Sequence, residues 1–318
     1  MKNDDVVSKI RLYMSALQKA IRWCEVNDAR YFARELVKTS NHGVCFTRLK
    51  VIAAEDTGLA DPTLLKYVWD CFDEFQFKKQ DIKISNVTDY PELYAIIDRA
   101  VTASALSYTS RHIAMLTFTT LFYIYKKEDC TASLDDYKNN FRIAVQERDE
   151  KNAAYYAFIV GVFLKSENLL FEIVHQEKEN RNRGLIDEWI SGYKRIREGD
   201  KLLILAGIIS LLCQDINYPH GEYIEQVSDC LSSPIEEARI PDRAYDMHTD
   251  EGKKMGRGLK HFFDDAASVR NERFPDDLEE KGKEMHFQAQ KEGLKENDVI
   301  VSIKGRCSDR GGQTMLRF

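Results

Sequence analysis

Apolar residues recur every three or four positions along most of this chain, and this spacing constrains the fold more than any other feature of the sequence. One stripe runs from residue 10 to residue 21, and another runs from residue 29 to residue 37. Apolar side chains at this spacing lie on one face of an α-helix. Only six prolines interrupt the 318 residues, which favours long helices over a strand-and-turn architecture. The sequence therefore predicts an all-α fold, an array of helical hairpins joined by short turns.

Two apolar segments need a separate interpretation. Residues 202–213 form the most apolar run, but this run is shorter than the roughly 20 residues that a helix needs to cross a bilayer. We interpret it as a helix buried in the core, and we expect no contact with a membrane. Residues 298–304 alternate apolar and polar side chains as a strand does, and a strand there would need a pairing partner.

We divide the sequence into three parts. Residues 1–170 form a helical domain, and residues 171–290 form a second helical region that contains a segment rich in glycine, lysine and histidine. Residues 291–318 form a small irregular extension, with one strand or no regular structure.

Composition and motifs exclude several classes of protein. The net charge of −6 gives no overall attraction to nucleic acid, so any such contact needs a local basic patch. Seven scattered cysteines without a C-x-x-C pair argue for free thiols and against a disulfide framework or a zinc ribbon. The first residues lack the apolar core of a secretory signal, and we expect a cytoplasmic protein. The sequence contains no G-x-x-x-x-G-K-[ST] phosphate loop and no other cofactor motif, so we expect no cofactor.

A helix–turn–helix corner is predicted at residues 48–62. Its signature residues are Arg48, Glu55, Asp56, Gly58, Asp61 and Pro62. Gly58 permits a tight reversal, and the Asp-Pro pair is typical of the start of the next helix. Carboxylates at a helix C-terminus oppose the helix dipole, so Glu55 and Asp56 need a partner such as Arg48 or the N-terminus of the following helix. The corner is either purely structural or a turn that faces a partner subunit or DNA.

The run from Arg48 to Pro62 resembles the R-L-x-x-I-A-S-E-D-I-G-L-A-D-P segment of the RarA/MgsA group of AAA+ ATPases, which act at stalled replication forks. A weaker similarity extends over residues 15–125. In that group the region is an all-helical, clamp-loader-like domain that holds a tetramer together. The resemblance implies a homo-oligomer with a link to DNA replication or repair, but the ATPase module is missing. Residues 107–110 also lack the lysine that the family carries in its P-K-S-N turn.

A second candidate site lies at residues 252–261, where four cations and three glycines occur without an acidic residue. A glycine-rich turn can expose backbone amides to a phosphate, and arginine can bind phosphate through two nitrogens. The candidate phosphate-binding or nucleic-acid-binding residues are Lys253, Lys254, Gly256, Arg257, Gly258 and Lys260. The alternatives are a solvated charged loop and a subunit interface.

Catalysis has weaker support in the sequence. His248, His261 and Asp264 are of the types that move protons or bind metals. No strict metal-binding spacing accompanies them, and we predict no metal site from the sequence. An enzyme is therefore less expected than a binding protein.

Three functions remain open at this point. The first is a non-catalytic, oligomeric accessory protein of DNA replication, repair or recombination, which contacts phosphate through residues 252–261. The second is an adaptor that binds only protein, such as a separate AAA+ ATPase or a replication factor. The third is a metal-dependent enzyme that acts on nucleic acid or nucleotides through His248 and His261.

Overall fold

The computed structural model describes residues 3–38, 42–80, 82, 87–127, 132–177, 182–216, 220–273, 278–295, 298–304 and 307. Within these ranges all regular structure is helical, and one isolated β-bridge joins Thr109 to Glu272. The predicted all-α fold is confirmed.

The chain forms two compact units, and each combines two separate stretches of sequence. The first unit comprises Met1–Arg111 and Pro219–Pro275, and the second comprises His112–Tyr218 and Asp276–Phe318. The boundaries at residues 170 and 290 drawn from the sequence stay predictions about domain organisation. Both candidate sites belong to the first unit, because residues 48–62 and 252–261 lie in its two stretches.

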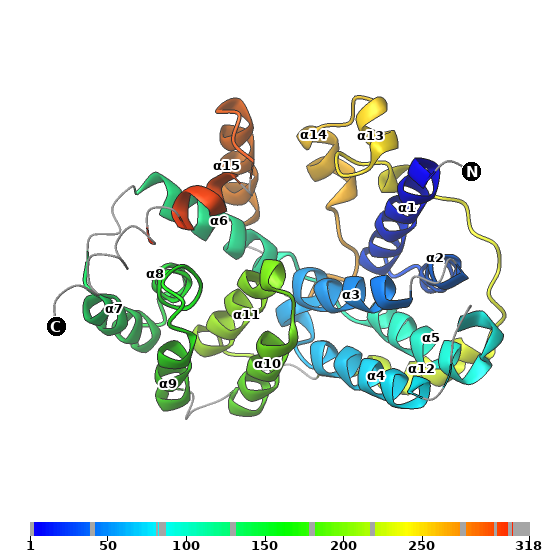
Figure 1. Cartoon of the computed structure of the whole chain (residues 1–318), viewed down its shortest axis with the longest axis horizontal. Helices are drawn as coiled ribbons and strands as arrows, with labels where there is room; N and C mark the ends of the chain where they lie inside the picture. The colour runs from blue at the N-terminus through cyan, green and yellow to red at the C-terminus, as the bar shows by residue number, and fades with distance from the viewer. Residues whose placement is uncertain are drawn as a thin grey trace. The chain divides into compact units, whose positions relative to one another are not determined.

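The helices of the first unit surround α5 (Pro91–Leu106). Its other α-helices are α1 (Asn3–Arg22), α2 (Val26–Lys38), α3 (His42–Ile52), α4 (Leu64–Lys79), α12 (Tyr223–Ser232), α13 (Asp250–Lys254) and α14 (Leu259–His261). Short π- or 3₁₀-helical turns are η1 (Ala53–Thr57), η2 (Gly58–Ala60), η3 (Val87–Asp89), η6 (Asp242–Ala244) and η7 (Phe262–Ala266). Helices α2, α4 and α12 all pack against α5, whose buried face includes the small residues Ala100, Ala103 and Ala105. Figure 1 shows the yellow segment of α12–α14 returning to the blue and cyan helices.

The second unit is centred on α11 (Lys201–Cys213), which packs against α6 (His112–Lys126), α8 (Glu150–Ala157) and α10 (Arg183–Arg195). Its remaining elements are α7 (Leu134–Gln146), η4 (Phe158–Phe163), α9 (Glu167–Glu177), η5 (Glu198–Asp200) and α15 (Glu279–Lys291). Almost every residue of α11 is buried. The interpretation of residues 202–213 as a core helix is therefore confirmed.

Local signals fix several helix starts. Ser133 Oγ accepts a hydrogen bond from the amide of Asp136 (3.1 Å), whose carboxylate accepts one from the amide of Ser133 (3.1 Å). This reciprocal capping box satisfies amides that have no partner within α7. Asp149 caps α8 by accepting a hydrogen bond from the amide of Asn152 (3.2 Å).

The strand predicted at residues 298–304 is wrong, because these residues are helical. The buried side chains here are Val299, Ile303 and Cys307, which are four residues apart, whereas Val301 is 68% exposed. A four-residue spacing places side chains on one helix face. The alternation seen in the sequence therefore had the wrong period. The final glycine-containing segment of the tail lies outside the described residues.

Two further expectations concern the chain as a whole. In the described ranges no helix is both long enough and apolar enough to span a membrane. Six of the seven cysteines lie in the part of the chain that the structure describes, and all six are free thiols there: Cys24, Cys45, Cys71, Cys213, Cys230 and Cys307.

We predict that Gly207→Ala destabilises the protein, because a Cβ atom at residue 207 of α11 would lie 1.9 Å from Cζ3 of the Trp189 ring. Overpacking of this kind costs about 1–3 kcal/mol. Gly184→Ala in α10 is the matched control, since a Cβ there meets nothing within 4 Å. Urea unfolding followed by circular dichroism should show a lower midpoint for Gly207→Ala and an equal or higher one for Gly184→Ala. Equal midpoints for wild type and Gly207→Ala would contradict this packing.

Candidate functional site

The corner at residues 48–62 begins where α3 widens into the π-helical turn η1. Gly58 follows with φ of 49°, a backbone conformation that glycine adopts without strain, and its amide donates to the carbonyl of Ala53. The predicted reversal at Gly58 is therefore present. Every residue of this turn except Glu55 is buried, so the corner lies inside the first unit.

Four buried or partly buried side chains form what we call the charge cluster: Arg22, Glu55, Asp56 and Arg111. Arg22 Nε donates to Asp56 Oδ1 (2.6 Å). Arg111 Nη1 donates to both Asp56 Oδ1 (2.7 Å) and Glu55 Oε1 (2.9 Å). The two carboxylates at the end of α3 thus find cationic partners, as their position at a helix C-terminus requires.

The partners differ from the ones that we expected. Arg48 does not reach either carboxylate by a hydrogen bond; its guanidinium instead donates to Gln18 Oε1. Gln18 in turn donates to Asp56 Oδ2 (2.6 Å). Arg48 therefore supports the charge cluster through an intermediate amide. The partner choice depends on how α1 and the segment before α6 pack on the corner, which local sequence does not encode.

The electrostatics of the charge cluster favour its ionised form. Burial alone would raise the pKa of Glu55, but the guanidinium groups of Arg111 and Arg22 outweigh burial and lower this pKa to about 2. Burial acts to lower the pKa of Arg111, and the carboxylates of Glu55 and Asp56 raise it overall. The two guanidinium groups and the two carboxylates neutralise one another. The charge cluster therefore holds α1, the corner and the segment before α6 together.

Asp61 and Pro62 lie just before α4, which begins at Leu64. Asp61 Oδ1 accepts a hydrogen bond from the hydroxyl of Thr63 (2.6 Å). Asp61 Oδ2 accepts one from the amide of Gly221 (2.9 Å). Asp61 therefore caps the turn before the helix and also holds the start of the returning stretch of the first unit.

Helix α1 also holds the second candidate segment. Ser15 Oγ donates to the carbonyl of Ala244 (2.8 Å), and Arg22 Nη1 donates to the carbonyl of Ala266 (2.8 Å). Lys19 forms a buried ion pair with Asp246. One helix thus connects the corner to residues 242–266.

The Lys19–Asp246 pair is ionised near neutral pH. Burial and the neighbouring Arg22 lower the pKa of Lys19 to about 8. Burial alone would raise the pKa of Asp246, but hydrogen bonding from His248 and the Lys19 ammonium lower it overall. Both groups therefore carry the charges that an ion pair needs, and this pair joins segments 227 residues apart in sequence.

Residues 252–261, which we call the basic segment, use several of their backbone amides in hydrogen bonds of their own. Thr249 Oγ1 accepts from the amide of Gly252 (3.1 Å) at the start of α13. At the other end the amide of Gly256 donates to Lys253, and the amide of Arg257 donates to Gly252. These two bonds, with Gly256 at φ of 72°, form a Schellman C-cap. The exposed row of amides expected for a phosphate cradle is thus replaced by helix caps at Gly252, Gly256 and Arg257.

The cations of the segment have different environments. Arg257 donates to the Asp242 carboxylate (2.5 Å) and to the carbonyl of Tyr245 (3.0 Å), so its guanidinium braces the turn. Lys260 forms an ion pair with Asp264 one turn further along. Within the described chain, Lys253 and Lys254 are exposed and have no ion-pair partner. Gly258 directly precedes α14.

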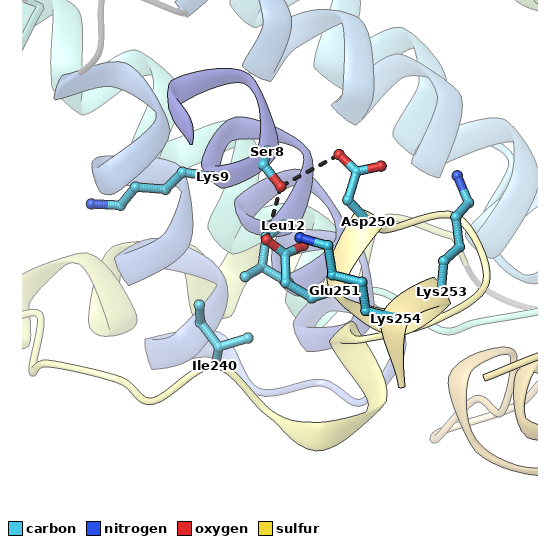
Figure 2. Close-up of a pocket in the computed structure, with 8 residues that line it drawn as sticks. All are labelled: Ser8, Lys9, Leu12, Ile240, Asp250, Glu251, Lys253 and Lys254. Carbon is cyan, nitrogen blue, oxygen red and sulfur yellow. Dashed lines mark hydrogen bonds between the residues drawn. The ribbon is translucent and has the colours of Figure 1, made fainter. Parts of the chain in front are cut away.

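Lys253 and Lys254 line a cavity of about 630 Å³ on the first unit. The other residues around it are Ser8, Lys9, Leu12, Ile240, Asp250 and Glu251. Ser8 Oγ donates to Glu251 Oε1 (2.8 Å). Figure 2 shows Lys254 reaching back towards Ser8 and Glu251, while Lys253 and Lys9 extend away from each other. The cavity therefore mixes both signs of charge.

The three candidate catalytic residues lie in different environments. His248 is 63% exposed, and its ring packs edge-on against Phe262 (5.1 Å between centroids). Asp264 is exposed beside Lys260. His261 is 23% exposed and lies near Asp242 and Asp265. The pairing of His248 with His261 that catalysis would need has no geometric support among these contacts.

Sequence reasoning missed the buried cations of α1 and a His–Glu pair in the second unit. Lys19 and Arg22 lie on the face of α1 opposite the apolar stripe, and both are nevertheless buried. The spacing of apolar residues predicts solvent exposure for that face, so no signal in the sequence marked these two cations. In the second unit, His112 Nε2 lies 2.9 Å from Glu150 Oε1, and Gln214 donates to Glu150 Oε2 (3.2 Å).

Comparison of the chain with known protein families, with curated proteins and with solved structures finds no match in any of the three. The resemblance to the RarA/MgsA group therefore rests on the residues of the sequence alone, above all on residues 48–62.

We predict that Asp56→Ala destabilises the protein by about 3–5 kcal/mol, because it leaves the Arg22 and Arg111 guanidiniums without their shared carboxylate. Asp70→Ala is the control, since Asp70 pairs with Lys66 on the surface of α4, and exposed pairs contribute about 0–1 kcal/mol. Equilibrium urea unfolding measures both. Equal losses in the two variants would mean that the charge cluster does not stabilise the fold.

Acid should lower the free energy of unfolding, because Glu55 becomes protonated. Its pKa is about 2 in the folded state against 4.5 ordinarily, so its stabilising contribution is present above about pH 4.5 and is lost as the pH falls towards 2. The stability difference between wild type and Glu55→Gln should therefore be largest at pH 7 and shrink between pH 5 and pH 3. Urea midpoints at these pH values test this, with Glu225→Gln on the exposed face of α12 as the control. A pH-independent difference would be the contrary result.

Proposed function

We propose that this chain is a non-catalytic, oligomeric accessory protein of DNA replication, repair or recombination, and that it contacts the DNA backbone through Lys253 and Lys254. The assembly part of the proposal rests on the resemblance of residues 15–125 to the RarA/MgsA group. The DNA part rests on the basic segment.

The observation that carries the DNA part is the exposure of two adjacent lysines on a fixed turn. Within the described residues neither Lys253 nor Lys254 has an ion-pair partner, so a phosphate would not have to displace one. The turn itself is held by the Thr249 cap, the Schellman motif at Gly256 and the Arg257 brace. A fixed turn loses little conformational entropy when it binds a ligand.

The surroundings of the other cations limit the proposed phosphate contact to Lys253 and Lys254. Arg257 pairs with Asp242, and Lys260 pairs with Asp264. A phosphate would have to displace these carboxylates before it could bind either cation. Asp250 and Glu251 lie beside the two free lysines and oppose the approach of phosphate. We therefore expect weak binding without sequence preference, in which the lysines act as point charges.

Charge reversal of both lysines should weaken DNA binding. We expect Lys253→Glu/Lys254→Glu to raise Kd for a 30-nucleotide single strand or a short fork by about tenfold or more in low salt. The slope of log Kd against log salt should also fall by about one for each lysine that contacts a phosphate. Fluorescence anisotropy across a salt series measures both quantities.

The matched control is Lys151→Glu/Lys281→Glu, which changes the net charge by the same amount at exposed positions of the second unit. It should leave both Kd and the salt slope close to wild type. Equal weakening in the two double variants would indicate a diffuse charge effect and remove the basic segment from the mechanism. Absence of DNA binding by wild-type protein would favour the protein-only adaptor, and light scattering with and without the fork tests assembly separately.

A further inference from the structure

Three side chains of metal-binding type converge at the base of the basic segment. Asp242 lies in η6, His261 ends α14, and Asp265 lies in the π-helical turn η7. One ligand atom from each lies within 4.8 Å of the other two. We call this group the Asp242–His261–Asp265 cluster.

The imidazole of His261 supplies an observation independent of the two carboxylates. Both of its ring nitrogens are shielded from solvent, and neither has a hydrogen-bond partner. The nearest approach to a carboxylate is 3.6 Å, between His261 Nε2 and Asp265 Oδ2. Buried polar atoms without partners are costly, and an ion that ligates one of them removes that cost.

Three other histidines of the described chain have a polar partner at one ring nitrogen. His42 Nε2 lies 3.0 Å from Lys79 Nζ, His112 Nε2 is bonded to Glu150, and His286 Nδ1 lies 2.8 Å from the carbonyl of Gly282. One ring nitrogen of His42, Nδ1, is also shielded and lacks a hydrogen-bond partner. Among the described histidines, only His261 has both ring nitrogens in this state, at a place where two carboxylates approach it.

The local fold holds the cluster together. His261 and Asp265 are four residues apart, across the junction between α14 and η7. The amide of Ala267 donates to the carbonyl of Phe262 (2.7 Å), the five-residue bond of a π-helix. Arg257 binds Oδ1 of Asp242, which leaves Oδ2 of that carboxylate for another ligand.

We propose that Asp242, His261 and Asp265 bind a divalent transition-metal ion of the zinc class. One imidazole nitrogen and two carboxylate oxygens suit zinc, cobalt or manganese, whereas magnesium and calcium favour sites made of oxygen alone. Water would complete the coordination. The ion would link residue 242 to residues 261–265, and so close the base of the turn that carries Lys253 and Lys254. The metal site does not depend on the proposed DNA contact.

Cobalt binding to the full-length, untagged protein tests this proposal. We expect about one Co²⁺ per chain, with visible d–d absorption and without the intense thiolate-to-cobalt bands that cysteine ligands would give. His261→Ala and Asp265→Asn should each weaken Co²⁺ and Zn²⁺ binding by at least about 100-fold in calorimetric titrations, since even outer-shell changes cost 10–100-fold.

Two neighbouring residues provide matched controls. His248→Ala and Asp264→Asn change the same residue types outside the cluster, and both should bind metal as wild type does. Circular dichroism of each metal-free variant establishes that it is folded, and His261→Gln serves in place of His261→Ala if the latter is not.

Three results would overturn the proposal: no saturable Co²⁺ binding by wild type, unchanged binding in folded His261 and Asp265 variants, or equal weakening in the controls. Lys253→Glu/Lys254→Glu should retain full metal affinity, so failure of the DNA proposal and failure of the metal proposal are distinguishable.

Discussion

Arg22 of α1 is the side chain on which the first unit depends most. Its guanidinium is fully buried and reaches Asp56, Glu55 and the carbonyl of Ala266. A buried cation is tolerated only when its hydrogen-bonding groups are satisfied. Arg22 therefore requires the corner at the end of α3 and the returning stretch near residue 266 to be in place together, and it links the two parts of the unit.

Lys19 extends this arrangement by one helical turn. Its pairing with Asp246 holds the stretch just before the basic segment on the same helix. The segment from residue 242 to residue 266 is thus fixed to α1 near both of its ends. Helix α1 therefore supports the basic segment, and the corner contributes to that support through the charge cluster. The start of α1 also lines the cavity that Lys253 and Lys254 border.

The contacts within and around the basic segment show that its residues Gly252, Gly256 and Arg257 serve the local fold. Gly252 is required because a Cβ would lie 2.0 Å from the carbonyl oxygen of Asp246, and Gly256 adopts a positive φ in a helix cap. Arg257 braces the turn against Asp242. What remains for a partner is the pair of exposed lysines on the outside, with the Asp242–His261–Asp265 cluster at the base. The two features are separate in chemistry and adjacent in the chain.

The helices, the core position of residues 202–213 and the reversal at Gly58 were predictable, because periodicity and glycine conformation are local properties. The alternation at residues 298–304 predicted a strand wrongly, because packing rather than the local pattern selected the helix face that became buried. Candidate residues such as Arg257 and His261 could be found by type, but their partners could not.

The sequence by itself determined where most helices form, and it showed that Glu55 and Asp56 at the end of a helix need cationic partners. Tertiary structure alone decided the partners: Arg22 with Asp56 across 34 residues, and Lys19 with Asp246 across 227. The reason is that hydrogen-bonded helices are specified by neighbours along the chain, whereas a buried charge is satisfied by whichever opposite charge the packed core brings within reach.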